Sequence, residues 1–366
     1  MKKKTGGKIR VGVLFGGKSA EHEVSLQSAQ NIIKALDRTK YDVVPIGIDK
    51  HGKWLLHDPL NYLLNAADPK LIKLNSSSRS VALAPESAGK ITALSTQEPM
   101  GSIDVVFPVL HGPFGEDGSI QGLLKVANVP FVGAGVLGSA VGMDKDVMKR
   151  LLRDAGIPIG KFITVAGYEK ITFAQAKKKL GTPLFIKPAN MGSSVGVSKV
   201  KNEKEFKSAL AEAFKYDTKV LIEEMIVGRE IECSVLGNEH PMASVPGEVI
   251  PHQDFYSYDA KYIDPDGAGL EVPAKLPKNI VKKVQDVAIK TFKALNCEGL
   301  GRVDMFLKKN GQIFVNEINT IPGFTKISMY PKLWEASGMP QPKLLDNLIK
   351  LGIERFERDQ KLQTEK

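Results

Sequence analysis

Residues 301–307 read GRVDMFL and residues 312–319 read QIFVNEIN, and the dipeptide Asn310-Gly311 lies between these two stretches. Apolar residues on both sides of an Asn-Gly dipeptide are typical of a β-hairpin with a two-residue type I′ turn, because these residues readily adopt the positive φ angles that the turn requires. The pattern therefore predicts an antiparallel hairpin in which Lys309 pairs with Gln312.

Polar side chains share one face of this predicted hairpin. Counting back from the turn places Asp304 opposite Glu317 and Arg302 opposite Asn319. Two carboxylates that face each other across a sheet repel, so a positive group is expected between them. Oxygen ligands of this kind suit a magnesium ion that holds phosphates. The alternative is a solvated strand face on which Arg302 neutralises both acids, and the hairpin alone does not decide between the two.

The composition is that of a globular protein with more than one domain. At 366 residues the chain is too long for a single ordinary core, which predicts two or three domains. Hydrophobic residues make up 42% of the chain, and no uninterrupted apolar run is long enough for a membrane span. No secretion signal is evident, and the only cysteines, Cys233 and Cys297, lack metal-ligand spacing. These features predict a cytoplasmic protein without a membrane partner.

The chain carries an excess of positive charge, with a formal net charge of +10 and a pI near 9.3. Such a charge is compatible with binding either nucleic acid or small anionic substrates. The lysines are spread along predicted helices and the termini, with few aromatic residues among them. This distribution favours small anionic substrates and predicts no nucleic-acid partner.

The first part of the chain alternates predicted strands and helices, which is typical of a parallel sheet in an α/β domain. Ligands of such sheets bind at the carboxyl ends of the strands, where Gly16-Gly17 and His111-Gly112 both fall. Residues 76–102 are interpreted as a variable surface excursion. The predicted strands cover 9–15, 41–48, 103–110 and 129–132, and the predicted helices cover 23–36 and a stretch after Asp117.

A second unit, of α+β type, is predicted to begin near Gly138, where Asp144 can cap a helix that Gly156 ends. A third unit begins after Gly228 and contains the hairpin. Residues 249–268, rich in Tyr, Asp, Pro and Gly, are expected to form an ordered lid loop, because long loops in compact domains are often functional. The second unit should contain strands 162–165, 184–186 and 220–223 and helices 173–180 and 203–214. The expected domains are 1–137, 138–228 and 229–366.

Residues 12–19, GVLFGGKS, match the phosphate-binding P-loop expression, but their context argues against this site. In a P-loop the first glycine ends the strand, whereas Gly12 lies inside a continuous apolar run that ends at Phe15. Too few residues remain to wrap a phosphate. A better candidate is the Gly- and Ser-rich stretch 187–197, because its backbone N–H groups can converge on an anion.

Two lysines and a linking segment accompany this Gly/Ser-rich stretch. Lys187, at the end of a predicted strand, and Lys145, on the neighbouring helix, can supply positive charge to phosphates. Residues 223–228 end a strand and could hold a nucleotide base, while Glu230 could bind a ribose hydroxyl. Alternatively, the Gly/Ser-rich stretch 187–197 is an ordinary hairpin loop, and Glu230 is an exposed acid at a strand edge.

Taken together, these features resemble the ATP-grasp fold, in which ATP is clasped between two α+β domains. Several motifs in the same order resemble the D-alanine:D-alanine ligase family over almost the whole chain. The resemblance implies an α/β and α+β protein with an N-terminal parallel-sheet, Rossmann-like domain followed by two α+β domains. The motifs are residues 16–25, 111–118, 142–145, 187–197 and 316–325.

The resemblance also implies an activity and its cofactors. Members of the family use ATP and Mg²⁺, or Mn²⁺, with two ions, to join two molecules of D-alanine through a D-alanyl phosphate for peptidoglycan synthesis. ADP and phosphate are released, and a homodimer is implied. The alternatives are another ATP-grasp ligase that joins a carboxylate to an amine, or a ligase that accepts D-lactate or D-serine.

Individual residues of this sequence receive roles from the resemblance. Glu21 would bind the ammonium group of the first substrate, His111 its carboxylate, and Ser328 the carboxylate of the second substrate. From the residues alone, Glu21 could be a helix N-terminal acid, His111 a buried turn histidine and Ser328 a helix cap. The other implied roles are metal binding by Asp304, Glu317 and Asn319; phosphate contacts by Lys145, Lys187 and Lys261; oxyanion contacts by Arg302 and the Gly323 N–H group; and a latch of Glu21, Ser193 and Tyr262.

The resemblance places the nucleotide base at the link between the second and third units, where Glu223, Met225, Ile226 and Glu230 lie. Met225 stands where many relatives carry a different residue, so contacts to adenine are expected to come from backbone and packing, and the role of the Glu223 side chain stays open. In related ligases that accept D-lactate, the residue at the position of Tyr262 differs, which supports D-alanine as the second substrate.

Overall fold

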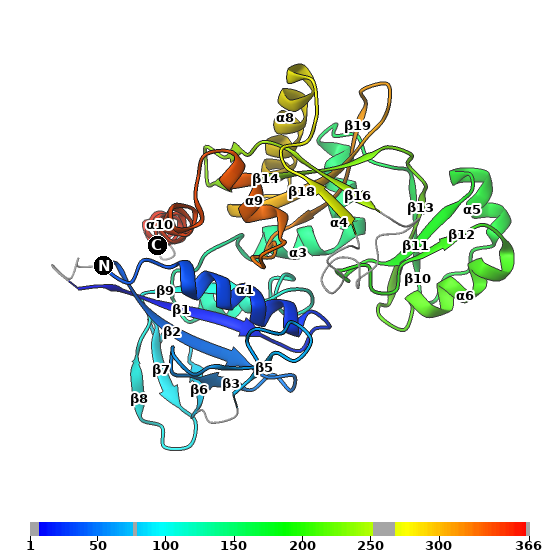
Figure 1. Ribbon diagram of the computed structural model, residues 1–366. Helices are drawn as coiled ribbons and strands as arrows, with labels where there is room; N and C mark the ends of the chain where they lie inside the picture. The colour runs from blue at the N-terminus through cyan, green and yellow to red at the C-terminus, as the bar shows by residue number, and fades with distance from the viewer. Residues whose placement is uncertain (1–6, 76–78, 252–267, 364–366) are drawn as a thin grey trace.

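The computed structural model describes residues 7–75, 79–251 and 268–363, which contain three main β-sheets with helices around them (Figure 1). The sheets follow one another along the sequence in the order of the three predicted units. Lys261 and Tyr262 lie outside the described residues, so their roles stay predictions. The domain boundaries at 137/138 and 228/229 also stay predictions.

The first sheet has seven strands in the order β8-β7-β6-β3-β2-β1-β9. Its last three strands, β2 (Tyr41–Ile48), β1 (Ile9–Gly16) and β9 (Val105–Val109), are parallel, as the sequence predicts. Strand β1 lies between the other two and is buried along most of its length, which explains its continuous apolar run. Helix α1 (His22–Ala35) follows β1, and helix α2 (Ser119–Val126) follows β9.

The prediction of a surface excursion at 76–102 is wrong for residues 79–102, the part that the structure describes. These residues form antiparallel strands that extend the first sheet. Alternate side chains such as Val81 and Leu83 reach the core and hold these strands in place. Residues 129–132 do not form the predicted strand, since only an isolated bridge at Phe131 pairs with β9. The additional strands are β3 (Trp54–Leu56), β6 (Arg79–Leu83), β7 (Lys90–Ala93) and β8 (Pro99–Ser102), and β4 (Leu63–Leu64) pairs separately with β5 (Lys73–Leu74).

The position of Gly12 confirms the argument against a P-loop. This glycine lies inside β1, where a Cβ atom would approach Cδ1 of Ile103 to 2.6 Å. The strand continues to Gly16, which has a φ of 92°. A loop that wraps a phosphate therefore does not begin at Gly12.

The second sheet has four antiparallel strands in the order β10-β13-β11-β12. Its apolar core includes residues of α5 (Phe173–Leu180) and α6 (Glu203–Ala213), which confirm the predicted helices. Thr172 and Asn202 cap these helices by accepting hydrogen bonds from backbone N–H groups. The strands are β10 (Phe162–Ala166), β11 (Leu184–Pro188), β12 (Ser198–Val200) and β13 (Lys219–Glu224).

Two helices precede this sheet, α3 (Val136–Met143) and α4 (Lys145–Asp154). The carboxylate of Asp144 accepts hydrogen bonds from the N–H groups of Asp146 and Val147, which confirms the predicted cap of α4. Because this cap fixes the first turn of α4, it also fixes the direction in which the side chains of that turn leave the helix.

The third sheet has six strands and contains the predicted hairpin. The last helix, α10 (Gln341–Asp359), packs between this sheet and the first one, because Leu344 and Leu348 share a core with Phe107 of β9 and with Leu236 and Leu300 of the third sheet. No helix in the described ranges is both long and apolar enough to cross a bilayer. The elements are β14 (Arg229–Gly237), β15 (Met242–Ala243), β16 (Gly247–Pro251), β17 (Ala268–Glu271), α8 (Lys278–Ala294), β18 (Gly299–Leu307), β19 (Ile313–Asn319) and α9 (Met329–Ala336).

Strands β18 and β19 form the predicted hairpin with the predicted register at its polar end. Asp304 lies opposite Glu317, and Arg302 lies opposite Asn319. The four side chains therefore share one face of the sheet.

The connection between these strands differs from the predicted two-residue turn, because it is one residue longer. Lys308, rather than Lys309, pairs with Gln312 through an N–H group that donates to the Gln312 carbonyl at 2.9 Å. Of the Asn310-Gly311 pair, only Gly311 has a positive φ, at 78°. A β-bulge gives β19 one extra residue at Asn316. This extra residue compensates for the longer turn, so Asp304 still pairs with Glu317.

His57 is a buried titratable side chain in the first sheet's core region, with 6% of its surface exposed. Within the described part of the chain, neither of its ring nitrogens has a hydrogen-bond partner. Burial lowers the pKa of His57 from 6.5 to about 4. The folded protein therefore holds this imidazole neutral, and protonation favours the unfolded chain.

We predict that His57 makes the protein less stable as the pH falls. Its contribution is fully present above pH 6.5 and is lost progressively between pH 6.5 and pH 4, because the folded pKa lies below the unfolded one. Moving from pH 7.5 to pH 5 should lower the free energy of unfolding of the wild type by roughly 1–2 kcal/mol more than that of His57→Leu. Urea titrations of both proteins at the two pH values measure this difference, and equal losses would contradict the prediction.

Candidate functional site

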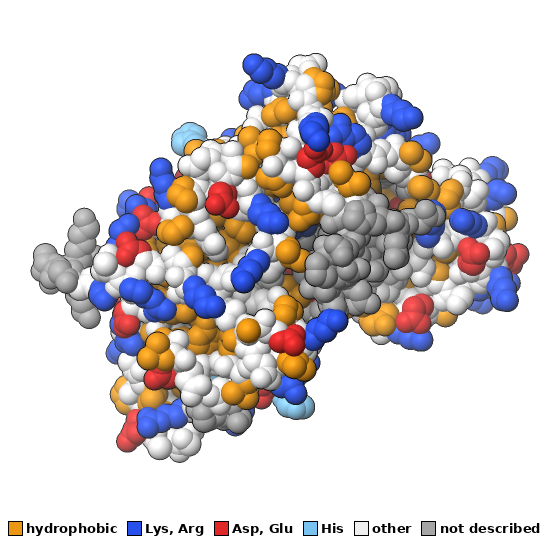
Figure 2. Space-filling view, viewed as in Figure 1, with side chains coloured by type: hydrophobic (Ala, Val, Ile, Leu, Met, Phe, Trp, Pro, Cys, Tyr) orange, Lys and Arg blue, Asp and Glu red, His pale blue; other side chains and the backbone are white. Residues whose placement is uncertain are grey.

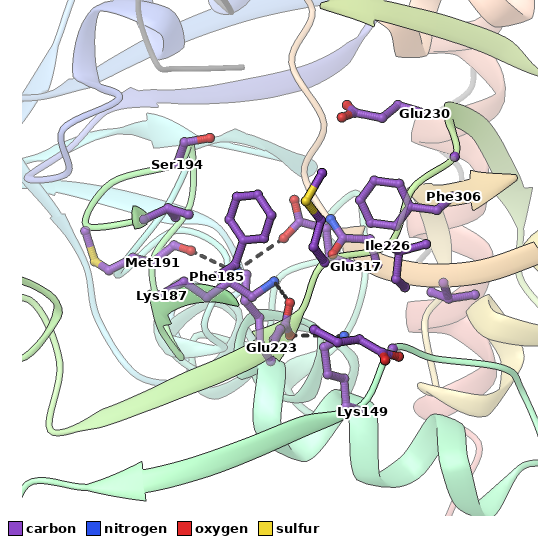
Figure 3. A pocket seen from close by; sticks show the side chains of 18 of the residues that line it. Lys149, Phe185, Lys187, Met191, Ser194, Glu223, Ile226, Glu230, Phe306 and Glu317 are labelled. Carbon is purple, nitrogen blue, oxygen red and sulfur yellow. Dashed lines mark hydrogen bonds and ion pairs between the residues drawn. The ribbon is translucent and has the colours of Figure 1, made fainter. Parts of the chain in front are cut away.

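A cavity of about 310 Å³ lies between the second and third sheets (Figure 3). Strands β11 and β13 contribute residues from the second sheet, β18 and β19 contribute residues from the third, and α4 contributes two lysines. The cavity brings together segments that are far apart in the sequence. The predicted nucleotide- and metal-binding residues that line it are Lys145, Lys187, Ser193, Glu223, Met225, Ile226, Glu230 and Glu317.

The pairing of β11 with β13 sets the geometry of one wall. Phe185 and Lys187 are two residues apart on β11, so both side chains face the cavity. Glu223 lies opposite Phe185 on β13 and is therefore the diagonal neighbour of Lys187. The Nζ atom of Lys187 lies 2.8 Å from Oε2 of Glu223.

Helix α4 supplies the other two ammonium groups of the cavity. The Nζ atom of Lys149 lies 3.1 Å from Oε1 of Glu223, and only 2% of the Lys149 side chain is exposed. One turn earlier, Lys145 donates a hydrogen bond to the carbonyl of Met191 at 2.7 Å and lies 3.4 Å from Oε2 of Glu317. The α4 helix therefore connects the two sheets through charge contacts.

The carboxylate of Glu223 is held in its ionised form. Burial raises the pKa of Glu223, but the ammonium groups of Lys149 and Lys187 outweigh burial, and the pKa lies below its usual value. Burial lowers the pKa of Lys149, against the attraction of Glu223. A buried carboxylate between two lysines is consequently anionic at neutral pH.

The acids of the hairpin have separate partners. Arg302 donates hydrogen bonds from Nε and Nη2 to the Asp304 carboxylate, both at 2.7 Å, and the Asn319 amide donates to it at 3.0 Å. The Nε atom of Arg302 also lies 2.9 Å from Oε2 of Glu232, which β14 places opposite Asp304. Since Glu317 pairs with a lysine of α4, the positive groups beside the two acids come from different elements.

The predicted metal ligands Asp304, Glu317 and Asn319 offer two carboxylates and one amide oxygen on one face of the hairpin. In the described part of the chain, no three His, Cys, Asp or Glu side chains are grouped so that they could hold a metal ion alone. A hard cation on this set would need further oxygen ligands from phosphate or water, which is usual for magnesium. The residues therefore fit Mg²⁺ or Mn²⁺ shared with a polyphosphate.

The Gly/Ser-rich stretch contacts the first sheet's unit at Glu21. Ser193 and Ser194 have φ values of 51° and 62°, a left-handed turn of the kind that exposes backbone N–H groups to an anion. The Ser193 hydroxyl donates a hydrogen bond to the Glu21 carboxylate. A Cβ atom at Gly192 would lie 2.9 Å from Oε2 of Glu21, so the stretch packs closely on this acid.

His111 is buried at the junction of the first sheet and the segment after β19. Its Nδ1 atom lies 2.9 Å from the carbonyl oxygen of Ile321, and its Nε2 atom lies 3.3 Å from Oγ of Ser28. Burial lowers the pKa of His111, so its imidazole is neutral at pH 7. Both the turn-histidine interpretation and the substrate-binding one are compatible with this geometry.

Gly323 and Ser328 lie together just before α9. A Cβ atom at Gly323 would lie 2.8 Å from Oγ of Ser328. The Ser328 hydroxyl oxygen accepts a hydrogen bond from the N–H group of Thr325 at 2.9 Å. The predicted residues that do not line the described cavity are Glu21, His111, Arg302, Asp304, Asn319, Gly323 and Ser328.

Several residues of the site were not identified from the sequence. Lys149 could have been found from its spacing, because it lies one helical turn after Lys145 on the same face. Phe306 could have been found from strand alternation, since it lies two residues after Asp304. Glu232 gives no such signal, because its position opposite Asp304 depends on the pairing of two distant strands.

Glu116 also escaped the sequence analysis, although it belongs to the 111–118 motif. Its carboxylate accepts hydrogen bonds from the N–H groups of Gly112 at 2.8 Å and Ile321 at 3.1 Å. Burial, and then the charge of Glu21, raise the pKa of Glu116 to about 8. This side chain therefore ties the turn after β9 to the segment after β19.

The face of the molecule seen in Figure 2 shows no single stripe of positive charge among the described residues. On the face seen in Figure 2, lysine and arginine side chains are scattered among acidic and apolar ones. On this face, the charges that contribute to the +10 net charge are therefore dispersed, as the spread of lysines along the sequence suggests.

Two family models match most of the chain. The D-ala D-ala ligase N-terminus model matches residues 10–134, and the D-ala D-ala ligase C-terminus model matches residues 151–350. A protein of Oceanobacillus iheyensis named D-alanine--D-alanine ligase is 58% identical over 361 residues, which is 98% of each chain. These similarities cover both the first sheet and the cavity.

Solved structures of D-alanine-D-alanine ligases are also similar to this chain. The D-alanine-D-alanine ligase from Coxiella burnetii superposes with a TM-score of 0.86 at 43% identity, covering 97% of this chain and 96% of that chain. The D-alanine--D-alanine ligase from Bacillus anthracis complexed with ATP has a TM-score of 0.72 at 29% identity and covers 96% and 99% of the two chains. With its sequence and its three sheets matched over nearly the whole length, this chain belongs to the D-alanine–D-alanine ligase family and has the ATP-grasp fold.

Proposed function

We propose that this protein uses ATP to join two molecules of D-alanine into D-alanyl-D-alanine for peptidoglycan synthesis. A carboxylate oxygen of the first D-alanine attacks the γ-phosphorus of ATP, ADP leaves, and an acyl phosphate forms. The amine nitrogen of the second D-alanine then attacks the acyl carbon, loses a proton and displaces phosphate. Both steps move negative charge between oxygens, so fixed positive charge is the main catalytic requirement.

The observation that carries this proposal is the placement of Lys145 beside Glu317, with Lys187 lining the same cavity between two sheets. The triphosphate would lie beside these two lysines and the N–H groups around Ser193. The adenine would lie against Met225 and Ile226, the predicted base-binding residues that line the same cavity. Glu223 is proposed as a polar contact of the base, and Glu230 as a polar contact of the ribose. Lys261 is proposed as a third lysine that contacts the phosphates.

Asp304, Glu317 and Asn319 would hold Mg²⁺ or Mn²⁺, and we propose two ions. The ions would neutralise charge on the β- and γ-phosphates. Because Arg302 already holds Asp304 with two hydrogen bonds, this arginine orients the metal ligand and lies close to the site where the oxyanion would develop.

The D-alanine subsites are proposed on the opposite side of the Gly/Ser-rich stretch. Glu21, which accepts a hydrogen bond from Ser193, would bind the first ammonium group, with Tyr262 completing the latch. His111 would contact the first carboxylate and Ser328 the second. The N–H group of Gly323, next to Ser328, would face the oxyanion together with Arg302. We further propose a cytoplasmic homodimer with the predicted domain boundaries.

D-alanine-dependent release of phosphate tests this function directly. With ATP, Mg²⁺ and D-alanine, the protein should form D-alanyl-D-alanine, ADP and phosphate in equal amounts, and phosphate release should stop when D-alanine or Mg²⁺ is omitted. Mass spectrometry of the product with D-lactate or D-serine added separates the alternative ligases. Formation of AMP would contradict an acyl-phosphate route, and tight salt-sensitive binding of DNA without ligation would favour a nucleic-acid-binding protein.

Glu317→Gln tests the proposed metal site. The substitution keeps the shape of the side chain but removes its charge, so kcat should fall about 100-fold or more, as expected for loss of transition-state charge stabilisation. The unfolding temperature should change little. Glu335→Gln, an exposed substitution on α9, serves as the matched control with wild-type activity. A Glu317→Gln enzyme with kcat within twofold of the wild type would refute the assignment.

A further inference from the structure

Lys149 is the most deeply buried charge of the cavity, and the proposed reaction does not use it. Its side chain is 2% exposed and reaches Glu223 from the α4 side, whereas Lys187 reaches the same carboxylate from β11 (Figure 3). A buried ammonium group is costly unless an opposite charge compensates it. The position of Lys149 therefore calls for a reason beyond packing.

Glu223 holds the two lysines at different oxygens. Lys149 lies 3.1 Å from Oε1, and Lys187 donates toward Oε2 at 2.8 Å. The Nζ atom of Lys149 also lies 5.9 Å from the centroid of the Phe162 ring, which is a second favourable contact for a cation. Lys149 thus has a contact that it does not share with Lys187.

The charge balance of this trio has a consequence for a phosphate ligand. With Glu223 alone, Lys187 would be bound in a neutral buried pair, and turning it toward a phosphate would leave an uncompensated carboxylate. With Lys149 present, the three side chains carry one net positive charge. Lys187 can then turn to a phosphate while Glu223 keeps a cationic partner.

We propose that Lys149 is a positioning residue that holds the charge of Glu223 and thereby makes Lys187 available to the phosphates of the nucleotide. This inference rests on the proposed function, because it takes the ligand of the cavity to be ATP. It predicts that Lys149 affects the binding of phosphates and leaves the binding of the adenosine part unchanged.

Lys149→Met tests the inference, since methionine fills a similar buried volume without charge. Isothermal titration calorimetry with MgADP and with adenosine, without D-alanine, measures the two parts of the ligand separately. The affinity for MgADP should fall about tenfold, the change expected from losing one charge-assisted contact, while the affinity for adenosine should stay within twofold. An equal loss for both ligands, or for neither, would overturn the proposal.

A double substitution distinguishes this role from a purely structural one. In Lys149→Met, replacing Glu223 by Gln removes the negative charge that retains Lys187 but keeps an oxygen that can still contact the base, so the affinity for MgADP should recover at least threefold. Lys149→Arg, which keeps the charge, should lie within threefold of the wild type. Lys178→Met, an exposed substitution on α5, is the matched control without an effect. If the double variant binds MgADP no better than Lys149→Met, the proposed link through Glu223 is wrong.

The outcome can be separated from a failure of the proposed function. Binding of MgADP and adenosine is measured without the amino-acid substrate, so it does not depend on which ligation reaction occurs. Thermal unfolding of each variant shows whether the fold is intact. A wild type that binds MgADP but forms no D-alanyl-D-alanine would refute the proposed reaction and leave the role of Lys149 testable.

Discussion

Compensation of buried charge between two sheets is the constraint on which the rest of the site depends. Lys145 connects α4 to Glu317 on β19, and Lys149 connects the same helix to Glu223 on β13. Because a charge removed from water must find a partner, α4 cannot shift relative to either sheet without breaking one of these contacts. The cavity therefore keeps its ammonium groups in place before a ligand enters.

Much of this arrangement follows from local rules. The alternation of side chains along a strand places Asp304 and Glu317 on one face, and the structure confirms their register. The Asp144 cap and the helix that it starts are likewise local signals, and they fix Lys145 at the first position of α4. The grouping of the predicted nucleotide-binding residues in one cavity was expected only from the family resemblance, because it requires two separate sheets to meet.

The differences arise where distant segments decide the outcome. The antiparallel strands within residues 79–102 form because they pair with the edge of the first sheet and bury side chains in its core, although the sequence of this segment predicts a surface excursion. In the hairpin, the longer turn and the bulge at Asn316 shift the strand pairing by one residue in opposite directions. The sequence pattern predicts the resulting pairing of the acids but neither of the two shifts. Glu232 could not be found because its pairing with Asp304 joins strands that are far apart in the chain.

The packing of α10 between the first and third sheets has a consequence for how the protein is made. The core that begins at β1 also contains residues of the third sheet, such as Leu236 and Leu300, and residues of α10, such as Leu344 and Leu348. On the ribosome, the first unit emerges long before the helix that covers it. The apolar side chains that α10 and the third sheet cover consequently stay open to water until those later elements have been translated, so a part of the molecule that is made early is completed by residues that are made much later.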